Sequence, residues 1–525
     1  MKCTLTVCFA TALLTTGLTK ATAEPALKLH FAGIENLIQR EDAKTLKAVW
    51  AQKETRTLRT EALGKLAKHL ATQSGKGVSI FNSILPDIGL GETYLTIAPG
   101  ERNPDVTFMT AMSKTRGGEW VKRLKQLSAR DGIEPEEKTQ AGYTGWRVDY
   151  KNGRSVGFGY ADGWLLLGIG KSTFETLKQA AQQISDSGRP APANTEQDLT
   201  LELTLPSQSP ALQTLLSGKA NAVRLTSRLR KDNFFTKAVV TYDEALPVST
   251  AKWEIPTRTI TEPLASFTAA RGVGLATARS VLGRTQLKPA NDQFFAWSQA
   301  RTKFQSFFAV KVGDPAAEIA GLAKRIDAFK KPGGAGENYI GKVVHDPKKP
   351  GVTWGNVPLF APYLTKANSA DKGYVVGGVF PPDPIKKPIP QELLNEFINK
   401  KNLVYYNWEI TGQRLEKWNL LIQFAAILSD RREQLVNKTK GIDFITSLYS
   451  KLGNTITDAT VDGKELTITR KSHLGLSALE IALLTRWLDN PQFPKPTLEW
   501  PNPADNTPRS KPKRIKPGKK PAAKK

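Results

Sequence analysis

Two glycine-rich stretches have the residue types of a nucleotide-binding loop, but neither has its spacing. Residues 168–172 read Gly-Ile-Gly-Lys-Ser, and the position where a phosphate-binding loop requires its first glycine holds Leu165. Residues 272–277 supply only two of the three glycines of a dinucleotide-binding fingerprint. Ser172 and Glu175 instead have capping-box spacing, which predicts the start of a helix. We therefore expect no nucleotide and no other cofactor.

Metal and thiol chemistry also lack candidates. Both cysteines, Cys3 and Cys8, lie near the start of the chain. The histidines are far apart, and none has a second histidine four positions away: His30, His69, His345 and His473. A zinc site would need ligands from distant segments, so we predict no metal site. His473 follows Arg470 and Lys471. We interpret it as the end of a strand.

Acid–base hydrolysis has one candidate carboxylate. The chain has no Gly-x-Ser-x-Gly nucleophile elbow. Glycoside hydrolysis needs two converging carboxylates, and Glu409, between Trp408 and Ile410 in a predicted strand, could serve as one of them. The alternative interpretation of Glu409 is a structural residue at the edge of a sheet. We assign no catalytic residue, and a hydrolase with dispersed acidic residues remains an alternative.

The strongest chemical signal is the charge of the C-terminus. Residues 507–525 contain nine basic residues and no acidic one. This composition cannot bury enough apolar surface to fold, so we predict that residues 506–525 are disordered. Such a tail can contact a polyanion, or it can serve only to keep the protein in solution. The predicted polyanion-binding residues are Arg509, Lys511, Lys513, Arg514, Lys516, Lys519, Lys520, Lys524 and Lys525.

Residues 1–23 have the organisation of a secretory signal: a basic residue, an apolar stretch over residues 5–18 and a small-residue cleavage site. We expect cleavage after Ala23 and a secreted or periplasmic protein; a lipid-anchored Cys8 is the rival interpretation. The apolar stretch is shorter than the roughly 20 residues that span a bilayer. Cleavage would leave no cysteine and 73 of the 75 basic residues against 49 acidic ones, a net charge of +24.

The elements expected to position these residues mix helices with strands. Residues 24–90 are predicted to form an N-terminal helical segment, with a helical pattern over residues 26–72. Residues 91–250 are predicted to form a first α+β domain. Within that domain, residues 199–205 alternate leucine with polar residues, which is typical of an antiparallel strand with one solvated face.

Residues 251–505 repeat this plan as a second α+β domain. Asp314 and Pro315 predict the start of one helix, and Ser477 with Glu480 predicts a capping box on the last. The two halves share an order of strands and helices without alignable identity, so an internal duplication is a hypothesis. We predict an α+β fold of antiparallel sheets with helices packed on one face.

Two segments in the C-terminal third resemble stretches of known proteins. Residues 402–412 read Asn-Leu-Val-Tyr-Tyr-Asn-Trp-Glu-Ile-Thr-Gly, and residues 466–476 read Leu-Thr-Ile-Thr-Arg-Lys-Ser-His-Leu-Gly-Leu. Both are similar to stretches of large uncharacterised bacterial secreted proteins. The resemblance implies a bacterial envelope protein and assigns neither a catalytic residue nor a ligand.

These observations favour an exported, non-enzymatic envelope protein. We expect its basic body and tail to associate with an anionic polymer or an anionic lipid surface, and with nucleic acid only if the chain is not exported. The first alternative is a carrier that shelters an apolar ligand, such as a lipid, between its sheet and its helices. The leucine face of residues 199–205 motivates this alternative.

Overall fold

The computed structural model describes residues 26–495, with gaps at residues 76, 99–103, 130–132, 141–142, 151–152, 154, 172, 192–195, 205–219, 250, 279–281, 284, 301–304, 331–341, 346–350, 357–361, 381–386 and 429–438. Within this described part, no helix has both the length and the apolar composition needed to cross a membrane.

The chain contains two successive sets of elements. The first set is β1 (Leu27–Phe31), α2 (Ile34–Gln39), α3 (Lys44–Ala51), α4 (Lys53–Ser74), α5 (Val78–Ile84), β2 (Thr93–Ala98), β3 (Asp105–Ala111), α6 (Lys114–Ala129), β4 (Glu136–Gln140), β5 (Tyr143–Asp149), β6 (Ser155–Ala161), β7 (Trp164–Ile169), α7 (Thr173–Ser187), β8 (Leu199–Thr204), β9 (Ala220–Arg230) and β10 (Asn233–Tyr242). The second set is β12 (Leu264–Arg271), η2 (Gly272–Ala278), β13 (Pro289–Gln299), β14 (Ser306–Val312), α10 (Pro315–Lys330), β15 (Lys342–His345), β16 (Gly351–Gly355), β17 (Tyr363–Lys366), β18 (Tyr374–Gly378), α11 (Gln391–Ile398), β20 (Leu403–Ile410), α12 (Thr411–Leu428), α13 (Lys440–Leu448), β21 (Asn454–Asp462), β22 (Glu465–Ser472) and α14 (Ala478–Asp489).

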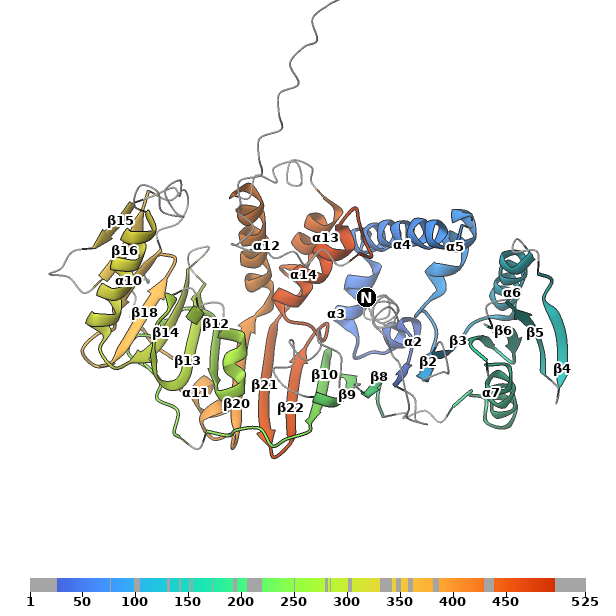
Figure 1. The fold of residues 1–525 in the computed structure, drawn as a ribbon, viewed down its shortest axis with the longest axis horizontal. Coiled ribbons are helices and arrows are strands. Elements are labelled where there is room, and N and C mark those ends of the chain that lie inside the picture. Colours follow the sequence, from blue (N-terminus) through green and yellow to red (C-terminus); the bar gives the residue numbers. More distant parts are fainter. Residues whose placement is uncertain are drawn as a thin grey trace, which may run out of the picture.

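One long antiparallel sheet runs through the molecule (Figure 1). Its strand order in the first half, from the outer edge inward, is β4-β5-β6-β7-β3-β2-β1-β8-β9-β10. In the second half it is β15-β16-β17-β18-β14-β13-β12-β20-β21-β22. The halves join where β10 pairs with β22, so each half supplies one central strand.

The two strand orders are the same when each element is matched to its counterpart. β1 corresponds to β12, β2 to β13, β3 to β14, β7 to β18, and the hairpin β9–β10 to the hairpin β21–β22. Helices α6 and α10 follow equivalent strands. The halves differ in their insertions, because α2 to α5 follow β1 in one half and α12 and α13 follow β20 in the other. The shared order supports the duplication hypothesis.

The α+β class and the antiparallel sheet are confirmed, but helices cover both faces of the sheet. In the first half, Leu165 of β7 packs in one cluster with Trp120 of α6, while its neighbour Leu166 packs in another with Leu177 of α7. The second half repeats this arrangement with α10 and α11. The reason is that β7 is apolar on consecutive residues, and such a strand is buried on both sides.

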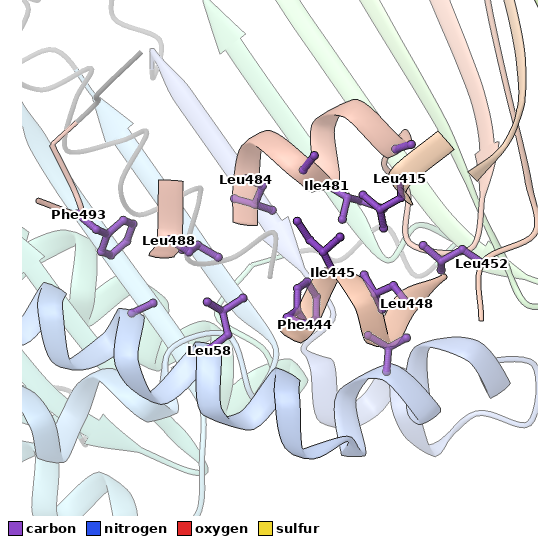
Figure 2. Close-up of a cluster of buried hydrophobic side chains, with 14 of the residues drawn as sticks. Leu58, Leu415, Phe444, Ile445, Leu448, Leu452, Ile481, Leu484, Leu488 and Phe493 are labelled. Carbon is purple, nitrogen blue, oxygen red and sulfur yellow. The ribbon is translucent and has the colours of Figure 1, made fainter. Parts of the chain in front are cut away.

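A layer of helices bridges the two halves on one side of the sheet. Leu58 of α4 lies in one apolar cluster with Phe444 of α13 and with Leu488 of α14 (Figure 2). Burial of each such side chain contributes about 1.5–3 kcal/mol. The layer therefore fixes the first half against the second, in addition to the β10–β22 pairing.

Several local predictions are confirmed. The alternating segment forms β8, and the Oδ1 atom of Asp314 accepts hydrogen bonds from the first turn of α10. Ser477 and Glu480 form the predicted capping box of α14. The predicted cap at Ser172 lies outside the described residues, as do the signal, residues 1–23, and the tail, residues 506–525.

The helical interpretation of residues 26–72 is wrong at its start. Leu27–Phe31 is strand β1, which pairs with β2 on one side and with β8 on the other. Its buried residues Leu27, Leu29 and Phe31 alternate with more exposed ones. This alternation covers only five residues and is hidden by the helical pattern that follows it. The helical stripe itself is confirmed, since Leu58, Ala62 and Leu66 are buried.

Candidate anion-binding face of the sheet

The candidate site lies on the sheet face opposite the bridging helices, where the two halves meet. On β10, Phe234 is buried toward the helices. Because side chains alternate along a strand, Phe235 and Lys237 point to the other face. Phe235 pairs in register with Arg228 of β9 on one side and Lys471 of β22 on the other. Strand alternation therefore places cations from both halves around one exposed aromatic ring.

This face is hollowed, with a volume of about 970 Å³. We call it the central basic hollow. Seven basic and two acidic residues line it, and Phe235, with 42% of its surface exposed, is among its few apolar residues. The charged lining residues are Arg228, Arg230, Lys231, Lys237, Lys400, Arg470, Lys471, Glu396 and Asp458.

The acidic residues of the hollow are engaged, whereas most of its cations are not. Asp458 forms an ion pair with Lys400 and a hydrogen bond with Thr469. Glu396 accepts a hydrogen bond of 2.9 Å from the hydroxyl of Tyr406. Within the described part of the chain, five exposed cations form no ion pair: Arg228, Arg230, Lys231, Lys237 and Lys471. Their positive charge is therefore available to an anion from solution.

The hollow is centred on the approximate twofold relation between the halves. The turn after Arg230 in the first hairpin corresponds to the turn after Asp462 in the second. Matching the two turns makes Lys237 the counterpart of Thr469, and these two residues face each other across β10 and β22. An elongated ligand that lies across the β10–β22 pairing therefore contacts equivalent backbone from each half.

Chemically, the hollow can bind an anion. Lysine and arginine donate charge-assisted hydrogen bonds to phosphate, sulfate or carboxylate groups. Phe235 presents an aromatic face to sugar or base rings. Among the described residues, no group of three His, Asp or Glu side chains is arranged to hold a metal ion.

Glu409 lies elsewhere, in the interior on the helix side of the sheet. It is 4% exposed, and β20 is a central strand between β12 and β21, so the edge position considered from the sequence is wrong. Its Oε1 atom accepts a 2.7 Å hydrogen bond from the backbone N–H of Ala478, at the start of α14. Burial raises the pKa of Glu409, against that hydrogen bond and the charge of Arg414. The arrangement anchors a helix to the sheet.

A second buried ionisable group lies on α12. Lys417 of α12 is 4% exposed, and its Nζ atom donates a hydrogen bond to the backbone carbonyl of Gln299. Burial, together with the charge of Arg414, lowers the pKa of Lys417 to about 8. Lys417 therefore connects α12 to β13.

His473 likewise has a structural role. Its Nδ1 atom lies 2.7 Å from the backbone carbonyl oxygen of Asp232, in the turn between β9 and β10. The Asp232 carboxylate in turn accepts hydrogen bonds from the backbone N–H and the hydroxyl of Thr45, in the first turn of α3. The strand-end interpretation of His473 agrees with this placement.

A polar cluster in the first half includes His30. The His30 Nε2 atom lies 2.9 Å from Oε1 of Glu92, which also accepts a 3.0 Å hydrogen bond from Tyr94. Burial raises the pKa of Glu92, but the His30 hydrogen bond and the charge of Arg189 outweigh it, so the pKa lies below its usual value. The cluster neutralises a carboxylate at the sheet surface.

The central basic hollow was not predicted from the sequence. The residues that were predicted to bind a polyanion, Arg509 to Lys525, lie outside the described residues. A signal for the hollow does exist. Arg224, Arg228 and Arg230 are separated by even numbers of residues in a segment with strand composition, so they share one face of a strand.

No family model and no curated protein matches this sequence. Two solved structures, titled "Structure of crystal form I of TP0453" and "Structure of crystal form III of TP0453", are each similar to 45% of this chain. The match to the first includes 84% of the chain in that structure, at 11% identity and a TM-score of 0.22. The match to the second includes 80% of the chain in that structure, at 12% identity and a TM-score of 0.21. Likeness at this level identifies neither a family nor a function.

Proposed function

We propose that this protein is an exported envelope protein that binds an anionic polymer in the central basic hollow. The observation that supports the proposal is the set of five cations around Phe235 that form no ion pair within the described residues. Cations without a partner contribute to polymer binding because each contact releases a condensed counterion from the polymer. The net positive charge of the chain adds long-range attraction.

A polymer fits the hollow better than a planar lipid surface does. The cations line a concavity on a sheet, and a flexible chain can follow a concave surface, whereas a bilayer first contacts the most prominent parts of a protein. The tail residues Arg509 to Lys525 would extend the same contact along the polymer, since a chain rich in lysine and proline stays extended.

The test is a titration of labelled dextran sulfate with the chain of residues 24–525, followed by fluorescence anisotropy at several salt concentrations. The double variant Lys237→Ala, Lys471→Ala removes two cations of the hollow. The matched control, Lys47→Ala, Lys68→Ala, removes two exposed lysines of α3 and α4. A third chain lacks residues 506–525.

We expect the hollow variant to bind more weakly than the control in chains with and without the tail. Equal affinity of hollow variant and control would reject the hollow as the site, and loss of binding only on tail deletion would assign the function to the tail. Vesicles of phosphatidylglycerol serve as the second probe. Binding to them without binding to dextran sulfate would replace the polymer with a lipid surface.

A further inference from the structure

A separate feature of the molecule is an apolar crevice between the first-half helices and the sheet. It has two chambers, of about 60 Å³ and about 80 Å³. One lies between α4 and residues 85–90, and the other extends toward β8 and β10. The two chambers share five lining residues: Phe31, Ile34, Trp50, Thr55 and Phe444.

The lining of the crevice is almost entirely apolar, and most of its polar groups already have partners. The Thr55 hydroxyl donates to the backbone carbonyl of Val49. Asp198 forms an ion pair with Arg40, and the Ser227 hydroxyl lies 2.9 Å from that of Thr236. Those groups are satisfied without a ligand.

Arg59 is the exception. It lines the first chamber, and its guanidinium lies 4.6 Å from the centre of the Trp50 ring. Within the described residues, no hydrogen bond or ion pair involves its side chain. Burial lowers the pKa of Arg59, because desolvation disfavours the charged form of its side chain. A guanidinium at an apolar wall is suited to a carboxylate, which can accept two of its N–H groups at once.

We infer that this crevice binds a small anionic amphiphile, with the carboxylate head on Arg59 and a short alkyl chain directed past Trp50 and Phe444. The inference does not depend on the proposed polymer binding, because the hollow is on the other face of the sheet.

The size of the crevice limits the ligand. An apolar cavity of about 150 Å³ accommodates a molecule the size of benzene. The two chambers together are of that order, so they hold an alkyl chain of about six carbons and exclude a lipid with two long chains. Each further methylene buried in the crevice strengthens binding about fourfold, until the chambers are full.

The experiment is isothermal titration of the chain of residues 24–525 with hexanoate and octanoate, and with octanol as the neutral ligand of equal length. We expect saturable binding of octanoate, between about fourfold and sixteenfold tighter than hexanoate, because one to two further methylenes are buried before the chambers are full. Octanol, which lacks the charge, is expected to bind more weakly.

Two variants separate this site from nonspecific binding. Arg59→Gln should abolish the preference for octanoate over octanol, whereas Arg56→Gln, which changes an exposed arginine one turn earlier on α4, should retain it. The hollow variant Lys237→Ala, Lys471→Ala should bind octanoate as the unmodified chain does.

Absence of saturable octanoate binding to the unmodified chain would overturn the inference. Equal loss of the octanoate preference in Arg59→Gln and Arg56→Gln would also overturn it, and circular dichroism confirms that each variant is folded. A chain that binds dextran sulfate but not octanoate would contradict the crevice alone, and the reverse result would contradict the hollow alone.

Discussion

Lys237 and Thr469 face each other across the pairing of β10 with β22, and each is the counterpart of the other in the two halves. The halves therefore meet at a point of approximate twofold symmetry. The side chains there have diverged, since one half has a lysine where the other has a threonine bound to Asp458. This divergence keeps one cation free at the centre of the hollow.

The first prediction concerns the salt dependence of polymer binding. With duplex DNA as a polyanion of known charge density, replacing one contacting lysine should reduce the slope of log affinity against log salt by about 0.9. Lys237→Ala should show this reduction, and Lys47→Ala should leave the slope unchanged. Both residues are exposed, so neither change should alter the free energy of unfolding by more than about 0.5 kcal/mol. The slopes are measured by anisotropy, and equal slopes for the two variants would contradict the prediction.

The sequence predicted local structure well where residues close together in the chain determine it. The capping box at Ser477 and Glu480, the cap at Asp314 and the strand from Leu199 to Thr204 were all recognisable, because each depends on neighbours in the chain. The order of elements in the two halves was also visible, although only the strand pairing shows that both halves have one topology.

The site could not be predicted in the same way. Arg228 and Lys237 lie on one hairpin, but Lys471 comes from a strand far along the chain, and only the β10–β22 pairing brings it beside them. Arg59 is likewise one arginine among many on a helix, and its isolation depends on what packs around Trp50. One-dimensional spacing contains neither the pairing nor the packing.

The second prediction concerns Lys417. Its pKa in the folded state, about 8, lies below the usual lysine value. Between these two pH values only the unfolded chain retains the proton, so the free energy of unfolding should rise as pH increases through this range. Below pH 8 the buried charge costs on the order of 2–3 kcal/mol. Lys417→Met removes this cost but also removes the hydrogen bond from Lys417 to the Gln299 carbonyl, a loss of about 1 kcal/mol.

Lys417→Met should therefore be more stable than the unmodified chain at pH 7, by about 1–2 kcal/mol. The difference should disappear or reverse above the usual lysine pKa. Urea unfolding at a series of pH values measures both effects. A variant that is less stable at pH 7 would show that the ammonium group contributes more than its burial costs.

The third prediction concerns Glu409. Burial raises the pKa of Glu409 in the folded state. Between the usual glutamate pKa and this raised pKa, the folded chain binds a proton that the unfolded chain has lost. The free energy of unfolding should therefore fall as pH rises through this range. Glu409→Gln keeps an acceptor for Ala478 and should remove this pH dependence. Glu409→Leu should cost about 1–3 kcal/mol, because the N–H of Ala478 is then buried without a partner.

Thermal unfolding between pH 4 and 8 tests this prediction, with Glu465→Gln as the control because Glu465 is an exposed carboxylate on the same sheet. If Glu409→Gln and the unmodified chain showed the same pH profile, the carboxyl would be ionised at its usual pKa. That outcome would mean that Arg414 and Arg470 compensate fully for burial.

The fourth prediction concerns the connection between the β9–β10 turn and α3. The carboxylate of Asp232 accepts two hydrogen bonds from Thr45, at 2.7 Å from its backbone N–H and 2.6 Å from its hydroxyl. Asp232 also has a positive φ of 60°, which asparagine tolerates better than other residues that keep a side-chain acceptor. Asp232→Asn should therefore keep most of the stability, whereas Asp232→Ala should lose about 1–2 kcal/mol as the start of α3 loses its acceptor. Because α3 also carries Trp50, Asp232→Ala should weaken octanoate binding. If Asp232→Ala changed neither stability nor octanoate affinity, the turn would not hold α3 in place, and the crevice would depend on the α4 and α13 contacts alone.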